Sequence, residues 1–566
     1  MKLRSLVLLA AASLLLFTAC KNSKSPDLLV PKEALMAIHI NLESLSSKLS
    51  WDEVSKTNWF QDIAKEASTD SVAKQLLAQP AQSGVNTSKS QTFFIASSKP
   101  RSFYTGFEGS LKDAAAFEKF LHQVDKEQKA SFTKEGDLNL ASSNEDVVIA
   151  WNNSKFLMLG NFGADKYGIP GNDGIYSGGN PLTVDSLKQI AVNLFKRKGD
   201  ALLGSDKRFA ELVTDGGDLH WWGNYVSTIF NEYSGGMLSM MKVNLLVENT
   251  ATAATISFDN GKITARSRQY VGKEVTNLFK EYEPKPISEA TLSRLPASEV
   301  LAAGAFSYKP EGLKALLQLI GMDGMVNGFL GRAGYSVDEF IKANKGEILF
   351  AISDFDLKRD STAYEDFDGK KSYIYRNEPK INFVAGTSVN DKEAFNKLIG
   401  ILLKETDKID QAKPNVSYKL GDSWFATGTS TGEVDAFLAG GSKPAYASKI
   451  AGHHAGFYLN FNRLFSIMQT IKEYEKADAA SERWQSEKAM LDASASFWDE
   501  VVANGDVKNG VLTSYAEVVL KDKNTNSLVQ LNKYLDKMYT LRPKEKAWDM
   551  SDAELTPMPA PVDSAR

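Results

Sequence analysis

The sequence predicts an α+β protein made of two tandem copies of an antiparallel sheet with helices packed on one face. The segment Ser110–Val124 (SLKDAAAFEKFLHQV) recurs as Ser388–Leu402 (SVNDKEAFNKLIGIL). Each copy places Ser-x-x-Asp before apolar residues at helical spacing, which is typical of a capped helix N-terminus. The elements around it follow the order strand–helix, strand–strand–helix, ribbon, strand–helix, hairpin. This order does not alternate as βαβ units do, so we expect antiparallel pairing.

The other elements also occur in matched pairs along the chain. A strand that leads to a helix at Pro31–Leu45 recurs from Pro296, where Pro310 is placed to start the helix. The remaining pairs are the apolar strands Gln91–Ser97 and Glu347–Ser353, the ribbons Val147–Gly160 and Tyr418–Gly428, the segments Trp221–Phe230 and Phe457–Phe465, and the turns Asn260-Gly261 and Asn509-Gly510. Asn-Gly between β-rich runs is a strong hairpin signal. We therefore place the first copy at residues 31–290 and the second at 291–541.

The sequence at each end of the chain predicts a segment that lies outside these copies. Lys2 and Arg4 precede an apolar run of 12 residues from Leu6 to Phe17, which is too short to cross a bilayer. The run leads to Cys20, the single cysteine of the chain. We interpret residues 1–19 as a lipoprotein signal peptide and Cys20 as the lipidated residue, with an ordinary cleaved signal as the alternative. Residues 20–30 follow as anchor and polar spacer, and residues 542–566 as a disordered Pro-rich tail.

Composition excludes several classes of function. The net charge is −4, and no basic run carries interleaved aromatic residues, so we expect no nucleic-acid partner. A hydrophobic content of 43% is that of a folded globular protein. With one cysteine the chain has no internal disulfide, so its stability must come from the core.

One segment matches a hydrolase motif. Gly428-Thr-Ser-Thr-Gly432 has the form G-x-S-x-G, in which Ser430 would be the nucleophile and His453 or His454 the base. The spacing Ser430-x-x-Glu433 is also a capping box for the helix that follows. The first copy has no serine at the matched point. We favour the cap, and we expect no catalytic residue.

Two insertions and one tryptophan pair supply the candidate binding residues. Trp221 and Trp222 are adjacent on a predicted strand, so one indole faces the core and the other faces away. The outward indole could stack on a ligand, but packing against the other copy is the more common arrangement. The Gly-rich insertion Gly160–Pro181 contains the candidates Tyr167 and Tyr176. Loops on a rigid scaffold commonly carry recognition, and a mobile insertion without function is the alternative.

The acidic insertion between Asp354 and Lys380 contains the candidates Asp354 and Asp356. Its carboxylates are concentrated as in calcium sites, but their spacing does not follow an EF-hand loop, and a solvated hairpin is the simpler interpretation. No histidine pair has the spacing of zinc ligands. We therefore expect no metal and no cofactor.

Several segments together resemble an uncharacterised lipoprotein family of Bacteroidetes-type bacteria, a domain of unknown function. They are VPKEALMAIHINLESLSSKLSWDEV, KGEILFAISDFDL and the doubled SxxDxxAFxK helix. The resemblance covers most of the chain after Cys20. It implies a fold and a location at the outer membrane, with the periplasmic face favoured because no acidic run follows Cys20. It implies no substrate, cofactor or catalytic residue.

The sequence leaves three hypotheses about function. The first is a non-catalytic envelope lipoprotein, attached to the membrane through Cys20, that binds a partner protein or polymer. The second is a periplasmic carrier that holds an apolar ligand between sheet and helices. The third is a serine hydrolase that uses Ser430. The first is preferred, because no catalytic constellation occurs in both copies.

Overall fold

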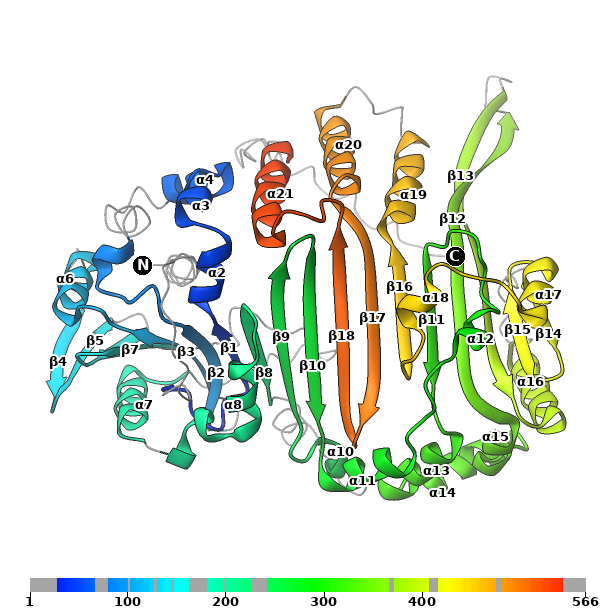
Figure 1. Ribbon diagram of the computed structural model, residues 1–566, viewed down its shortest axis with the longest axis horizontal. Helices are drawn as coiled ribbons and strands as arrows, with labels where there is room; N and C mark the ends of the chain where they lie inside the picture. Colours follow the sequence, from blue (N-terminus) through cyan, green and yellow to red (C-terminus); the bar gives the residue numbers. More distant parts are fainter. Residues whose placement is uncertain are drawn as a thin grey trace, which may run out of the picture.

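The fold is a single long sheet with helices around it. The computed structural model of the chain describes residues 28–66, 80–99, 102–125, 130–143, 147–161, 181–197, 199–224, 242–365, 371–406, 416–474 and 481–542. The strands within these ranges form one sheet of 18 strands, and all of its pairings are antiparallel. Figure 1 shows this sheet extending along the longest axis of the molecule.

The order of the strands follows from their pairings. From one edge to the other the strands are β4 (Ser131–Glu135), β5 (Leu138–Ser143), β6 (Val147–Trp151), β7 (Lys155–Asn161), β3 (Ser102–Ser110), β2 (Gln91–Lys99), β1 (Met36–Ile40), β8 (Leu219–Gly223), β9 (Ala251–Asp259), β10 (Lys262–Tyr270), β18 (Val511–Leu520), β17 (Trp498–Lys508), β16 (Ala455–Asn460), β11 (Ala302–Ser307), β12 (Asn344–Glu365), β13 (Lys371–Val389), β15 (Trp424–Gly428) and β14 (Ser417–Leu420).

Read outward from its centre, the sheet has the same order of elements on both sides. On one side β10 is followed by β9, β8, β1, β2, β3, β7 and β6, and on the other β18 is followed by β17, β16, β11, β12, β13, β15 and β14. At the centre, Arg266 of β10 lies opposite Tyr515 of β18. Each is the fifth residue after the glycine of its Asn-Gly turn, Gly261 or Gly510.

Helices cover both faces of the sheet and both ends of its strands. They are α2 (Leu42–Lys48), α3 (Trp51–Ser55), α4 (Asn58–Glu66), α6 (Ala114–Val124), α7 (Val184–Lys196), α8 (Lys207–Thr214), α10 (Asn244–Val247), α11 (Lys273–Glu281), α12 (Glu289–Leu292), α13 (Pro310–Leu319), α14 (Asp323–Arg332), α15 (Val337–Ala343), α16 (Lys392–Thr406), α17 (Thr431–Ala439), α18 (Ala447–Ile450), α19 (Phe461–Tyr474), α20 (Glu482–Ala495) and α21 (Ser527–Leu541). In Figure 1, α19, α20 and α21 lie along the upper ends of the central strands, and α11, α13 and α15 along the lower ends.

The expectation that helices pack on one face is wrong. Phe94 of β2 belongs to a core cluster with residues of α7 and α8, whereas its neighbour Phe93 packs in a cluster with Phe117 of α6. Successive strand residues point to opposite faces. Since β2 is apolar on both faces, each face needs its own covering helices.

The expectation of one sheet for each copy is also corrected. The two halves of the chain share a continuous sheet, because β10 pairs with β18 along eight residue pairs from Lys262–Val519 to Gln269–Leu512. This pairing satisfies backbone groups that would otherwise lie at an open edge of each half.

The start of the first half also differs from the expected boundary. The sequence predicts a polar spacer through Val30, but Leu28, Leu29 and Val30 are all buried in the core of the first half. This apolar run is drawn into the fold, and the N–H of Leu29 donates to the buried carboxylate of Glu108 at 3.1 Å. Residues 1–27 and 543–566, including the predicted signal peptide, Cys20 and the predicted tail, lie outside the described residues.

The local predictions for the repeated helix agree with the structure. Asp113 accepts a hydrogen bond from the N–H of Ala116 at 2.9 Å at the start of α6, and Asp391 accepts one from Ala394 at 2.8 Å at the start of α16. Phe117 is 5% exposed and Phe395 is 4% exposed. Both helices therefore bury most of the apolar face that their spacing indicates, although Leu402 at the end of this face in α16 is 57% exposed.

Candidate functional site

The structure scatters the candidate binding residues. Trp222 is buried in the core, where its ring packs edge-on against Phe209, so a ligand at the surface does not reach it. Trp221 is half-buried on the opposite face of β8. Tyr167 and Tyr176 lie outside the described residues, as does most of the insertion Gly160–Pro181.

The acidic insertion forms a long hairpin. Asp354 pairs with Asn382 and Asp356 with Lys380, and the pairing of β12 with β13 continues to Glu365 and Lys371. Figure 1 shows this hairpin projecting past the upper ends of the neighbouring strands. Within the described residues, no group of acidic, histidine or cysteine side chains is arranged to hold a metal ion.

Ser430 caps a helix. Its Oγ accepts a hydrogen bond from the N–H of Glu433 at 3.3 Å, and the Glu433 carboxylate accepts from the N–H of Ser430 at 3.1 Å. This is the reciprocal capping box that the sequence predicts for α17. His453 instead bonds to the Asp506 carboxylate through Nδ1 at 2.8 Å.

A pocket of about 690 Å³ lies near the centre of the sheet, where the two halves meet. Its floor is formed by β10, β18, β17, β16, β11 and β12, and its cover by α11, α13 and α15. Most of its lining is apolar, with Leu278 and Phe279 of α11 and Leu313 and Leu316 of α13 on the cover. A pocket of this size and chemistry is typical of small-molecule sites.

The floor of the pocket is a row of small side chains. Ser267, Ser514, Gly505 and Ala455 lie directly opposite one another on four adjacent strands. A Cβ placed on Gly505 would be 3.6 Å from the Cβ of Ala455, an ordinary contact distance, so the space above this glycine is free. The row continues with Phe306 and Ile348, which rise at one side of the floor.

Two large side chains at the pocket are unusually exposed. Phe306 is 50% exposed and Ile348 is 40% exposed, although both are apolar. Exposed apolar surface that lines a concave site marks a place where a ligand or a partner binds.

The positions of the first half that correspond to this floor carry large side chains instead. Ile256 and Gly505 each lie four residues before the asparagine of their Asn-Gly turn, Asn260 or Asn509. Ile256 pairs with Leu219, just as Gly505 pairs with Ala455. Leu219 packs in a cluster with Leu42 of α2 and Leu528 of α21. Leucine and isoleucine therefore occupy the positions at which the second half has alanine and glycine.

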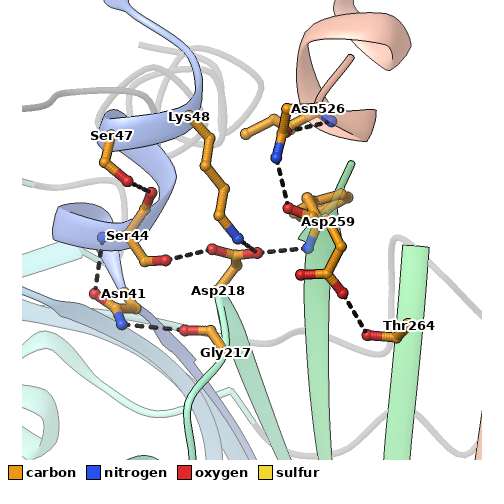
Figure 2. A network of polar contacts seen from close by, with 11 residues as sticks. Asn41, Ser44, Ser47, Lys48, Gly217, Asp218, Asp259, Thr264 and Asn526 are labelled. Atoms are coloured by element: carbon orange, nitrogen blue, oxygen red, sulfur yellow. Dashed lines mark hydrogen bonds and ion pairs between the residues drawn. The ribbon is translucent and has the colours of Figure 1, made fainter. Parts of the chain in front are cut away.

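A polar network holds α2 onto the first half (Figure 2). The buried carboxylate of Asp218 accepts hydrogen bonds from Ser44 Oγ at 2.6 Å and Lys48 Nζ at 2.6 Å, both on α2. It also accepts from the N–H of Phe258 at 2.6 Å. Three donors compensate the cost of burying this carboxylate. The network fixes α2 over this end of the sheet.

His454 occupies the equivalent place in the second half. Its Nδ1 accepts a hydrogen bond from the N–H of Val507 at 3.0 Å, and its carbonyl accepts from the N–H of Ser307 at 2.7 Å. Its ring lines the pocket, and the residue is 7% exposed. No bond from His454 to α13 occurs among the described residues. Helix α13, the first helix after β11, therefore lacks the side-chain bonds that anchor α2 to Asp218.

Asp506 and Lys309 are the charged residues of the pocket lining. Burial alone would raise the pKa of the Asp506 carboxyl, but hydrogen bonds from the His453 ring and the His454 N–H outweigh burial and hold this pKa below its usual range. Lys508 Nζ lies 3.7 Å from the same carboxylate. Asp506 is thus ionised and already surrounded by donors, whereas Lys309 is exposed at the start of α13.

The sequence did not predict this pocket. Its lining comes from six strands and three helices, which no linear motif brings together. One signal was present: Ala455 and Gly505 replace Leu219 and Ile256 at matched positions of the two halves. Smaller side chains at two paired positions of the core leave a cavity unless neighbouring side chains fill the space.

Comparisons with known proteins give a family and distant structural similarities. A family model described as "Domain of unknown function (DUF4836)" matches residues 27–363. No curated protein matches. Among solved structures, crystal form III of TP0453 is 9% identical, with a TM-score of 0.22, over 45% of this chain and 82% of that chain. Crystal form IV of TP0453 is 10% identical, with a TM-score of 0.24, over 45% and 83%. No helix in the described ranges is long and apolar enough to span a membrane.

Proposed function

The chain belongs to the DUF4836 family, a domain of unknown function, and from that premise we propose that it is a binding protein built from two copies of one α+β unit, which takes an apolar or amphipathic ligand into the pocket beneath α11 and α13. The proposal follows the carrier hypothesis rather than the partner hypothesis preferred from the sequence. The observation that carries it is the pocket itself.

The matched strand order of the two halves supports the duplication. So do equivalent backbone hydrogen bonds. The N–H of Asn224 donates to Leu35 at 2.7 Å, and the N–H of Asn460 donates to Leu301 at 2.9 Å. Two unrelated segments would have no reason to share both a strand order and such contacts.

The difference between the halves supports ligand binding. Folding requires each half to bury apolar surface, and the first half does so with Leu219, Ile256 and the α2 anchor at Asp218. The second half leaves the same region open and keeps Phe306 and Ile348 exposed to solvent. Leaving such surface uncovered costs stability, because apolar burial drives folding. A ligand that covers it offsets this cost.

The proposed location is the outer membrane, at its periplasmic face, with the chain anchored through lipid on Cys20. The support is the short apolar run that precedes the single cysteine. An anchored protein with an apolar pocket lies close to the pool of lipids from which it could draw a ligand.

The test is to extract the purified protein with organic solvent and to analyse the extract by mass spectrometry. The wild type should release a stoichiometric apolar compound. Ala455→Leu with Gly505→Ile copies the packing of Leu219 and Ile256, so this variant should fold and release none. Gly432→Ile is the matched control, because a Cβ atom at this position meets no atom within 4 Å. Equal yields of the compound from the wild type and the double variant would contradict the proposal.

A second function, partner binding, is favoured by the β12–β13 hairpin. It continues beyond the neighbouring strands as an isolated two-stranded ribbon that carries Asp354 and Asp356 (Figure 1). Replacing residues 357–378 by a short turn should leave the melting temperature nearly unchanged and remove crosslinks to an envelope partner. Unchanged crosslinks would show that the hairpin is not the contact.

A further inference from the structure

The tautomer of His454 is fixed by its surroundings. A backbone N–H can only donate, so Nδ1, which accepts from Val507 at 3.0 Å, carries no hydrogen. In the neutral ring the hydrogen is therefore on Nε2.

The Nε2–H group has no acceptor among the described residues, and this nitrogen stays accessible although His454 as a whole is more than nine-tenths buried. A donor that the protein leaves without a partner is satisfied by a ligand or by water. Here His454 lines a pocket whose other residues are mostly apolar. Ser307, whose N–H donates to the His454 carbonyl, is followed two residues later by Lys309. A neutral donor and a cation thus both belong to the lining of the pocket.

We infer that the ligand of this pocket is a long-chain carboxylic acid. Its carboxylate accepts a hydrogen bond from His454 Nε2 and faces Lys309. Its apolar chain lies over the row of small residues Ser267, Ser514, Gly505 and Ala455. The inference rests on the proposed function and adds the chemical class of the ligand. An apolar chain suits the row of small residues and the leucines of α11 and α13.

The charges of the lining favour an acid over an amine. The Asp506 carboxylate already accepts from His453 and from the N–H of His454, and Lys508 lies beside it. A ligand cation would have to compete with these donors for Asp506. A ligand carboxylate instead meets two groups, Nε2–H and Lys309, that have capacity for it. Hydrogen bonds to a charged group are the stronger kind.

The test compares an acid with its ester. The wild-type protein is loaded with cis-parinaric acid, and its fluorescence is followed as palmitic acid or methyl palmitate is added at neutral pH. The two competitors share a chain and differ in charge at the head. We expect palmitic acid to displace the probe at an about tenfold lower concentration, the effect of one hydrogen bond to a charged group.

Two variants separate a ligand contact from a structural role. His454→Asn keeps an acceptor for the Val507 N–H but removes the donor at the Nε2 position, whereas His454→Gln keeps a donor close to that position. Both variants should fold. His454→Asn should lose the preference for the acid, and His454→Gln should largely retain it.

Equal displacement by acid and ester in the wild type, or an unchanged preference in His454→Asn, would overturn the inference. If the acid–ester test fails but the double variant Ala455→Leu with Gly505→Ile binds neither competitor, the pocket is still the binding site. In that case only the proposed class of ligand is wrong. If the double variant binds the probe as the wild type does, the proposed function itself is wrong.

Discussion

Asp218 and His454 receive the same backbone hydrogen bond, although one is a carboxylate and the other an imidazole. The N–H of Phe258 donates to Asp218 Oδ2 at 2.6 Å, and the N–H of Val507 donates to His454 Nδ1 at 3.0 Å. Asp218 also holds Ser44 and Lys48 of α2, whereas His454 makes no bond to α13 within the described part of the chain. The bonds of Asp218 to α2 are drawn in Figure 2. The exchange of Asp218 for His454 thus distinguishes the closed packing under α2 from the open pocket under α13.

The packing of α2 on the first half should depend on the Lys48–Asp218 ion pair. In Lys48→Met, the Asp218 side chain, which is fully buried, loses its cationic partner. We expect the free energy of unfolding to fall by about 3 kcal/mol, because a buried charge is left uncompensated. Lys56→Met is the control, since its pair with Asp52 is exposed and should contribute less than about 0.5 kcal/mol. Equal effects in urea denaturation would mean that the network does not anchor α2.

The repeated helices should contribute equally to the core. Phe117→Ala and Phe395→Ala should each lower the free energy of unfolding by roughly 3–5 kcal/mol, from lost burial and the cavity left behind. Phe329→Ala is the control, because Phe329 is 73% exposed. A loss below about 1 kcal/mol at either core position would show that its helix face is not essential.

Two buried histidines should make the fold sensitive to acid. Burial, together with the nearby His220, lowers the pKa of His39 from 6.5 to about 3. The unfolded chain therefore binds a proton at a higher pH than the folded chain does. Stability should be constant above about pH 6.5 and should fall as the pH drops from 6.5 towards 3.

Urea denaturation at a series of pH values checks this expectation. His39→Gln should make the loss of stability between pH 6.5 and 3, the window set by the pKa of His39, less steep, with His220 still contributing, whereas His122→Gln, at an exposed position, should leave the profile as in the wild type. An unchanged slope in His39→Gln would assign the acid sensitivity to other groups.

Lipid attachment makes a separate prediction. Cys20→Ala should release the protein into the soluble periplasmic fraction and should abolish incorporation of labelled fatty acid. Retention of both label and membrane association in the variant would contradict an anchor at Cys20.

Local features of the fold follow from the sequence, because short-range interactions decide them. Asp113 and Asp391 cap their helices, Ser430 caps α17, and both Asn-Gly turns form hairpins. The single sheet could not be predicted, because pairing of β10 with β18 joins residues about 250 positions apart. The pocket could not be predicted for the same reason. Periodicity indicates which face of a strand is apolar, but not whether a helix will cover it.

The most direct test of the account is to find where a bound fatty acid lies. Palmitic acid with a photoreactive diazirine at the end of its chain should be bound by the purified protein, crosslinked by light and mapped by peptide mass spectrometry. We expect labels on α11 and α13, at residues such as Phe279 and Leu316, and loss of this labelling in the double variant Ala455→Leu with Gly505→Ile. Labels confined to other elements, or unchanged labelling of α11 and α13 in that variant, would contradict it.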